Sequence, residues 1–127
     1  KLKMQDKNIL IIEHDAIIAL DLKRNFEKNG FQVAGVNFTL KEALEKMKSF
    51  KNLDLILMDL GIQDFSVNCM LAERVYKIAQ IPIILLASNL DEYLRSLCSK
   101  YNKVKIVKKP FKNEDLILLA GNLASEN

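Results

Sequence analysis

The fold of this chain is decided by the segment KNILIIEHDAIIALDLKRNFEKNGF, residues 7–31. The segment opens with a short apolar run at 8–12, and Ile18, Leu22 and Phe26 then recur at helical spacing. This pattern predicts a buried strand followed by a helix that runs to about Asn29. Gly30 stops the helix, since glycine commonly stands just past a helix end.

The same change of periodicity recurs along the rest of the chain. Further short apolar runs predict strands at 32–36, 53–58, 83–86 and 104–107, with a helical pattern after each. Thr39 and Glu42 form a capping box at the second helix, in which Glu42 reaches back to the Thr39 amide. The other predicted helices carry apolar stripes at Val67, Leu71, Val75 and Ile78; at Leu90, Leu94 and Leu97; and at Leu116, Leu119 and Leu123. Parallel strands joined by helices predict a doubly wound α/β sheet with helices on both faces.

Composition limits the kind of protein. The 127 residues are 50% hydrophobic and 28% charged, with a formal net charge of +3, which indicates a single soluble domain over 1–127. The longest apolar stretch, 81–87, is too short to span a bilayer, and no leader opens the chain. We therefore expect a cytoplasmic protein without membrane contact, in which Cys69 and Cys98 are free thiols.

Several site chemistries are excluded by counts and spacing. With His14 as the sole histidine, zinc sites that need two imidazoles are ruled out, and four glycines fit neither a dinucleotide-binding fingerprint nor a P-loop. Lysines cluster between 103 and 112, but no aromatic residues alternate with them. The cluster therefore indicates a solvated edge and not a nucleic-acid site.

Charged residues follow three of the predicted strands, at the edge where doubly wound sheets bind ligands. Glu13 and Asp15 follow the first strand, Asp59 the third and Lys109 the fifth. Such a set suits phosphoryl transfer. Asp59 would be the nucleophile, carboxylates would hold Mg²⁺, and Lys109 would offset charge on the phosphoryl oxygens.

Four segments resemble the receiver domain of two-component response regulators over nearly the full chain. They are residues 7–31, DLILMDL at 54–60, IPIILLAS at 81–88 and VKKPFKNEDL at 107–116. The resemblance implies a flavodoxin-like fold with five parallel strands in the order 2-1-3-4-5. It also implies a phosphoprotein, not an enzyme, that serves phosphorelay signal transduction and receives its phosphoryl group from a histidine kinase or a phosphotransfer protein.

The resemblance also assigns roles to residues. Asp59 falls on the phosphoacceptor and Lys109 on the active-site lysine of the family. Glu13 falls on the first acid of the family's metal site, and Gly61 on the residue whose backbone carbonyl binds the metal. His14 stands where the second acid, a direct Mg²⁺ ligand, is usual.

His14 is a poor ligand for Mg²⁺, which prefers hard oxygen ligands. We therefore expect a weakened Mg²⁺ site that could accept Mn²⁺ instead. Asp15 could reach in from the next position, or it could simply cap the first helix. His14 itself is either an atypical ligand or an exposed loop histidine without a ligand role.

Two further departures concern the output of the domain, and a third concerns the loop that carries Gly61. Ala87 replaces the hydroxyl residue of the family. Ser88, the next residue, is the candidate hydroxyl donor, but it would face away from the site unless the strand ends in a bulge. Ile106 replaces an aromatic residue that takes part in activation. The loop LGIQDFSVN, at 60–68, lacks the usual Pro-Gly and Asp-Gly turns.

Two hypotheses remain open at this point. One is a receiver phosphorylated on Asp59, and the other is a degenerate receiver that binds partners without phosphorylation and keeps Asp59 and Lys109 as a structural ion pair. Small enzymes of similar architecture are disfavoured, because Gly61 stands where a haloacid-dehalogenase-type phosphatase needs an acid and 13–18 lacks a flavin phosphate loop. Pairing through the fourth helix, fifth strand and fifth helix is an expected route to a homodimer.

Overall fold

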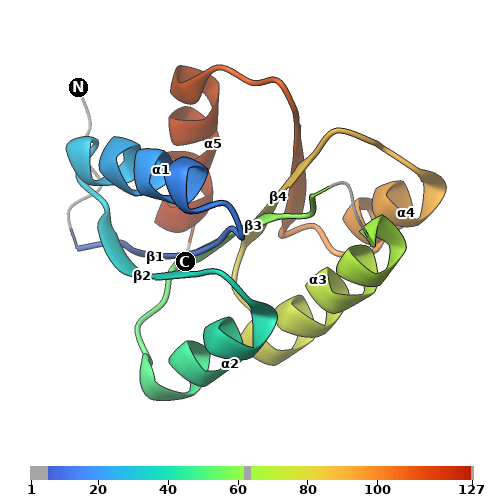
Figure 1. The fold of residues 1–127 in the computed structure, drawn as a ribbon, viewed down its shortest axis with the longest axis horizontal. Coiled ribbons are helices and arrows are strands. Elements are labelled where there is room, and N and C mark those ends of the chain that lie inside the picture. Colours follow the sequence, from blue (N-terminus) through green and yellow to red (C-terminus); the bar gives the residue numbers. More distant parts are fainter. Residues whose placement is uncertain (1–5, 62–63, 127) are drawn as a thin grey trace.

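The computed structural model describes residues 6–61 and 64–126, and within them five strands alternate with five helices (Figure 1). In chain order the elements are β1 (Asn8–Ile12), α1 (Ala16–Lys28), β2 (Gln32–Asn37), α2 (Leu40–Ser49), β3 (Leu55–Asp59), α3 (Phe65–Ala79), β4 (Ile83–Ala87), α4 (Glu92–Lys100), β5 (Val104–Lys108) and α5 (Asn113–Ser125). The alternation predicted from periodicity is confirmed, with strand bounds that differ by one or two residues.

The strands form one parallel sheet in the order β2-β1-β3-β4-β5. Helices α1 and α5 cover one face, and α2, α3 and α4 cover the other (Figure 1). Alternate residues of β1 point to the two faces: Ile9 and Ile11 pack with α1 and α5, while Leu10 and Ile12 pack with α2 to α4. The predicted doubly wound flavodoxin-like fold is therefore confirmed.

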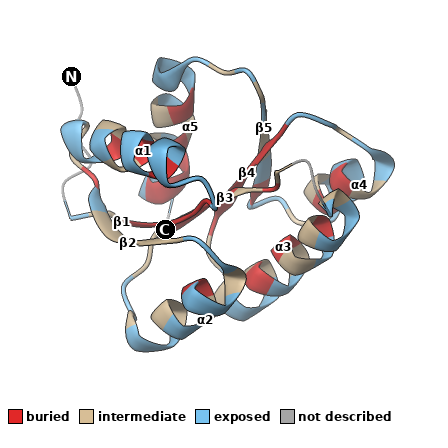
Figure 2. Cartoon of the chain, in the orientation of Figure 1, coloured by how far each residue is buried: buried red, intermediate tan, exposed pale blue. Residues whose placement is uncertain are grey.

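The central strands are the most deeply buried part of the chain (Figure 2). Residues 55–58 of β3 and 83–87 of β4 are buried, whereas β2 and most of β5 at the sheet edges are only partly buried. Burying one such Leu or Ile side chain contributes about 1.5–3 kcal/mol. This core fixes the strand ends that carry the charged residues.

Two helix details differ from the sequence prediction. Thr39 does cap α2, with its Oγ1 accepting from the Glu42 amide at 3.2 Å, but the Glu42 carboxylate accepts from the Phe38 amide instead of the Thr39 amide. The buried stripe of α3 consists of Cys69, Ala72 and Val75. Val67 and Ile78 are instead 51% and 60% exposed, because several faces of α3 carry apolar residues and spacing alone does not say which faces the sheet.

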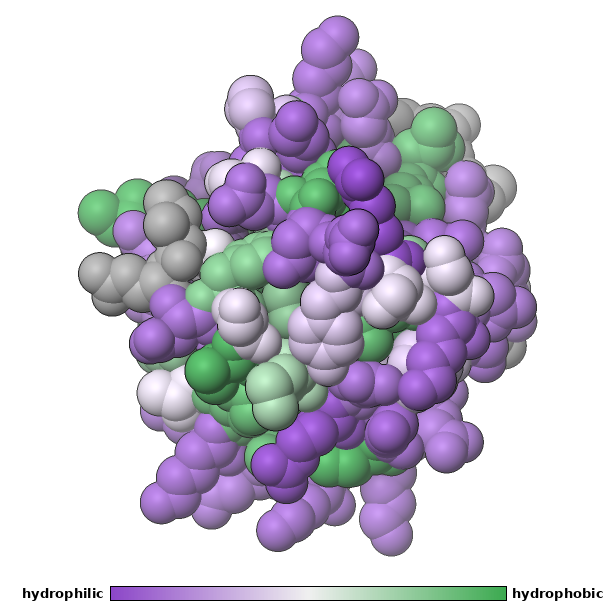
Figure 3. Space-filling model, turned by 90° about the vertical axis from the view of Figure 1, so that its right-hand side faces the viewer, coloured by the Kyte–Doolittle hydropathy of each residue, from purple (hydrophilic) through white to green (hydrophobic). Residues whose placement is uncertain are grey.

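Some apolar side chains reach the surface. On α3, Met70 is 57% exposed, and hydrophobic patches lie between hydrophilic ones on the side of the molecule that carries α4 (Figure 3).

Both cysteines are free thiols, as predicted, with Cys69 buried. Among the described residues, no helix combines the length and apolarity that a bilayer crossing requires.

Candidate functional site at the carboxyl edge of the sheet

The backbone brings the predicted site residues to one edge of the sheet. Asp59 is the last residue of β3, and Lys109 directly follows β5. Hydrogen bonds continue the sheet past the strand ends: the Lys109 amide donates to the Ala87 carbonyl oxygen and the Leu60 amide to the Leu86 carbonyl oxygen, both at 2.9 Å. The buried strands therefore position this site.

Asp59 and Lys109 form an ion pair at the centre of this edge. Lys109 Nζ lies 2.6 Å from Asp59 Oδ2, and the Asp59 side chain is only 2% exposed. The other oxygen, Oδ1, accepts from the Gly61 amide at 2.7 Å. Burial raises the pKa of Asp59, but hydrogen bonds from Glu13, Lys109 and the Gly61 amide outweigh it, so the pKa lies below its ordinary value. Asp59 is therefore an ionised carboxylate at neutral pH.

Glu13 lies beside Asp59 and is buried. Its Oε2 accepts from the Asp15 amide at 3.1 Å and lies 3.3 Å from His14 Nδ1. Its Oε1 is buried and accepts no hydrogen bond from the described residues. Burial, a hydrogen bond with Asp59 and the Asp59 charge together raise the pKa of Glu13 to about 7. Glu13 can therefore keep a proton that it shares with Asp59.

A hard cation would fit part of this arrangement. Glu13 and Asp59 supply carboxylate oxygens, and Glu13 Oε1 is buried and accepts no hydrogen bond from the part of the chain that the structure describes. Gly61 adjoins them with a positive φ of 69° that favours glycine. No cluster of three or more His, Cys, Asp or Glu side chains that could hold a metal occurs within 6–61 and 64–126. The residues fit a site made of two carboxylates and a backbone carbonyl, with water completing the shell.

His14 lies at the rim of the site, whereas Asp15 is directed toward helix α1. The His14 side chain is 73% exposed, and its Nδ1 faces Glu13. Asp15 is the N-cap of α1, where its Oδ1 accepts from the amides of Ile17 and Ile18 at 2.9 and 3.1 Å. The capping interpretation of Asp15 is confirmed, and it leaves this carboxylate engaged with the helix.

Two cavities adjoin the ion pair. One, of about 460 Å³, is lined by Asp59, Lys109, Ser88 and Phe111, among others. The other, of about 420 Å³, lies on the opposite side of the pair and is lined by His14, Gly61 and Asn68 together with Asp59 and Lys109. The pair is thus accessible from two sides although the Asp59 side chain is nearly buried.

Ser88, the hydroxyl residue that follows Ala87, was expected to face away from the site if it continued the strand, and the structure places it at the rim of the ion-pair cavity. Strand β4 ends at Ala87, so the alternation of a strand no longer governs Ser88, which lines the cavity beside Asp59 and Lys109. Ala87 itself is fully buried, and Ile106 is partly buried against the core.

Asn68 is a site neighbour that sequence reasoning missed. Its amide Nδ2 donates to the Leu60 carbonyl oxygen, one residue past Asp59. The only sequence signal is a polar residue in the first turn of a helix, which is common on exposed helices. Residues 62 and 63 of the loop predicted to lack the usual turns lie outside the described residues.

Comparison with known proteins gives consistent matches. A family model for the response regulator receiver domain matches residues 9–120. The phyllosphere-induced regulator PhyR of Methylorubrum extorquens is 30% identical over 103 residues, which cover 81% of this chain and 38% of that protein. The chain therefore spans well under half the length of this curated relative.

Solved structures agree with the family model. The receiver domain of Francisella response regulator 1452 is 26% identical, with a TM-score of 0.77 over 95% of this chain and 98% of that one. The anti-anti-sigma factor PhyR of Bartonella quintana is also 26% identical, with a TM-score of 0.72 over 99% of this chain and 49% of that one. With the family model matching most of its length, this chain belongs to the response regulator receiver domain family.

Proposed function

We propose that this chain is the phosphoacceptor receiver of a cytoplasmic phosphorelay, in which Asp59 takes a phosphoryl group from a histidine kinase or a phosphotransfer protein. The observation that carries this proposal is the 2.6 Å ion pair between Lys109 and the nearly buried Asp59, reached by cavities from two sides. An ionised carboxylate beside a fixed cation is the arrangement that phosphoryl transfer to an aspartate requires.

The proposed transfer is balanced and needs no oxidant or reductant. An oxygen of the Asp59 carboxylate attacks the phosphorus atom of a phosphohistidine, and the P–N bond breaks. The histidine nitrogen keeps the electron pair and takes up a proton, which leaves an acyl phosphate on Asp59. Lys109 offsets charge on the phosphoryl oxygens, and the hydroxyl of Ser88 donates to them from the shared cavity.

Mg²⁺ is the proposed cofactor, held by Glu13, Asp59 and the Gly61 carbonyl. When bound, the ion supplies positive charge that offsets the phosphoryl oxygens. His14 in place of a second acid lowers the affinity for Mg²⁺, and Mn²⁺ would tolerate the imidazole better. Protonated Glu13 must lose its proton before it can serve as a ligand, which lowers the affinity further at acidic pH.

The phosphoryl donor is proposed to dock on α1. Ile17 is 82% exposed and Leu20 46% exposed, and Ile18, which is 45% exposed, also lines the cavity that holds Asp59 and Ser88. Exposed apolar side chains next to a site favour contact with a protein partner. A donor seated there would present its phosphohistidine to Asp59.

Acetyl phosphate tests the phosphoacceptor role without a cognate kinase. The chain is incubated with acetyl phosphate and Mg²⁺, Mn²⁺ or EDTA, and its intact mass is measured. We expect one phosphoryl adduct with either metal, more with Mn²⁺, and none with EDTA. The absence of an adduct under all three conditions would contradict the proposal.

A second candidate function is a receiver that binds its partners without phosphorylation. It is favoured by the Asp59 carboxylate, both of whose oxygens already have partners within the chain, and by His14 at the metal-site position. The similar structure from Bartonella quintana is named an anti-anti-sigma factor, a name that mentions no phosphoryl transfer. The same mass experiment separates the two candidates, because the second one predicts no adduct.

A further inference from the structure

Glu73, on α3, binds both ends of α4. Its Oε1 accepts from the Tyr93 hydroxyl at 2.9 Å, and its Oε2 accepts from the Tyr101 hydroxyl at 2.8 Å. Tyr93 is the second residue of α4, and Tyr101 is its C-cap. The two tyrosines are eight residues apart, about 12 Å along a helix, so one carboxylate holds the whole length of α4.

The surroundings of Glu73 strengthen these two hydrogen bonds. The Glu73 side chain is only 18% exposed, which limits competition from water. Lys100 and Lys77 lie 3.5 and 3.8 Å from Oε2, but their side chains are 63% and 60% exposed, so these ion pairs contribute little. Hydroxyl bonds to an ionised carboxylate are the stronger contribution.

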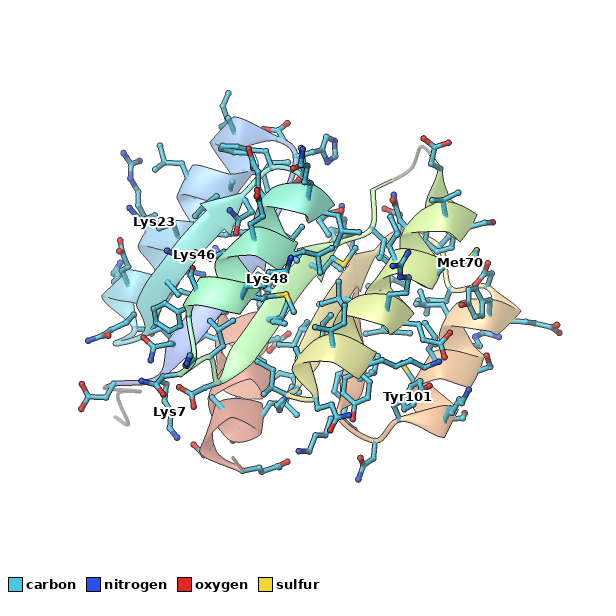
Figure 4. All side chains as sticks on the ribbon, turned by 90° about the horizontal axis from the view of Figure 1, so that it is seen from below. Lys7, Lys23, Lys46, Lys48, Met70 and Tyr101 are labelled. Carbon is cyan, nitrogen blue, oxygen red and sulfur yellow. The ribbon has the colours of Figure 1, made fainter. Side chains whose placement is uncertain are left out.

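Tyr101 also packs by its ring. The Tyr101 ring contacts the Tyr76 ring of α3, with the two ring centroids 4.9 Å apart. The Lys100 ammonium lies 5.3 Å from the centroid of the Tyr101 ring. Figure 4 shows Tyr101 between α3 and α4. The contact between the two helices is therefore polar at Glu73 and aromatic next to it.

Helix α3 is also bonded to the site near its N-terminus. Asn68, in its first turns, donates to the Leu60 carbonyl oxygen directly after Asp59. Both Asn68 and Glu73 belong to α3 and lie five residues apart. The backbone after Asp59 and helix α4 are thus both bonded to side chains of the same helix.

We propose that Glu73, Tyr93 and Tyr101 form a clasp that restrains α4 against α3, and that α3 transmits a shift of the Leu60 backbone, directly after Asp59, to α4 through this clasp. The route differs from one through β4 and β5, where Ala87 lacks a hydroxyl and Ile106 lacks an aromatic ring. Its meaning for signalling rests on the proposed function, whereas the restraint itself does not depend on phosphorylation.

The restraint is tested by hydrogen–deuterium exchange in the unphosphorylated chain. In the double variant Tyr93→Phe/Tyr101→Phe, amides of 92–100 should exchange about tenfold faster or more, because two hydrogen bonds to a charged group are lost. Glu73→Gln should loosen the same amides although it lies on a different helix. Tyr76→Phe is the matched control, since it removes a neighbouring hydroxyl outside the clasp, and it should change nothing.

Unchanged exchange of 92–100 in the double variant, or an equal effect of Tyr76→Phe, would overturn the restraint. Amides of β1 and β3 should stay protected in every variant, which shows that the chain is folded. If Glu73→Gln disturbs these strands, the double tyrosine variant still decides the outcome.

The route is tested by combining substitutions. Asn68→Ala should speed the exchange of α4 amides severalfold when the clasp is intact, and should add nothing when Tyr93→Phe/Tyr101→Phe has already opened it. An Asn68→Ala effect that persists without the clasp, or that never reaches α4, would overturn the route. Neither experiment uses phosphate, so a chain that takes no adduct from acetyl phosphate refutes the proposed function and leaves these results to judge the clasp.

Discussion

At the scale of single residues, Glu13 links the site to the stability of the fold. Its pKa is raised from 4.5 to about 7 by burial, by a hydrogen bond with Asp59 and by the Asp59 charge. Between these two values the folded chain keeps a proton that the unfolded chain loses. Stability therefore falls as the pH rises through this window, by up to about 3 kcal/mol, and levels off above it.

Glu13→Gln should remove this dependence, because glutamine does not titrate. We expect the melting temperature to fall from about pH 5 to about pH 8 with Glu13 and to stay nearly flat in the Glu13→Gln variant, measured in EDTA. Both proteins should carry His14→Asn, so that the only imidazole does not contribute. Equal slopes in the two proteins would show that Glu13 is ionised throughout.

The Asp59 pKa is displaced in the opposite direction. Burial raises it, but hydrogen bonds from Glu13, Lys109 and the Gly61 amide lower it below its ordinary value of 3.8. Its contribution to stability is present above that value and is lost only as the pH falls through the lower folded pKa. Glu13 and Asp59 therefore change the stability of the fold in separate pH ranges.

Removing Lys109 should leave Asp59 as a buried charge without its cation. We expect Lys109→Met to lower the free energy of unfolding by about 1–3 kcal/mol, discounted because the lysine side chain is 29% exposed. Adding Asp59→Asn should restore part of the loss, since the buried charge is then gone. Urea denaturation of the single and double variants measures the free energy of unfolding. A double variant that is less stable than Lys109→Met would contradict the claim that Lys109 stabilises the fold by compensating the Asp59 charge.

The metal site offers a gain-of-function test. His14→Asp should tighten Mg²⁺ binding clearly, because it adds a hard carboxylate ligand beside Glu13 and Asp59. Calorimetric titration measures the affinity, with His14→Asn as the control that removes the imidazole without adding charge. Equal Mg²⁺ affinity in the aspartate and asparagine variants would mean that position 14 does not face the ion.

At the scale of elements, α1 carries a test of how the donor docks. Ile17→Ser should slow phosphotransfer from a phosphorylated histidine protein about tenfold, because Ile17 is 82% exposed and adjoins Ile18, which lines the Asp59 cavity. Its rate with acetyl phosphate should not change, since this small donor needs no docking surface. The phosphotransfer rates of both proteins are measured with each donor. Equal losses of rate with the two donors would show that Ile17 affects the chemical step and not docking.

The sequence predicted elements better than it predicted their faces. In α1 the predicted stripe included Ile18, which is 45% exposed, whereas Ala19 is buried with Leu22 and Phe26. In α3 the predicted stripe was offset in the same way. Large apolar residues at helical spacing mark a helix, but small residues such as Ala19 and Ala72 face the sheet where the backbones approach closely.

At the scale of the whole molecule, the doubly wound sheet followed from alternating periodicities, and the strand-end rule correctly brought Glu13, Asp59 and Lys109 together. Ser88 was treated as a continuation of the strand, but the strand ends one residue before it. The clasp on Glu73 could not be predicted, because it joins side chains 20 and 28 residues apart whose meeting depends on how α3 packs on α4.

The central claim is that Asp59 carries the phosphoryl group. After reaction with acetyl phosphate and Mn²⁺, the chain is digested under acidic conditions and the peptide that bears the adduct is located by mass spectrometry. We predict one phosphoryl group on the peptide that contains Asp59, labile to hydroxylamine as an acyl phosphate is, and no adduct in Asp59→Asn. An adduct on another peptide, or one that persists in Asp59→Asn, would contradict the account.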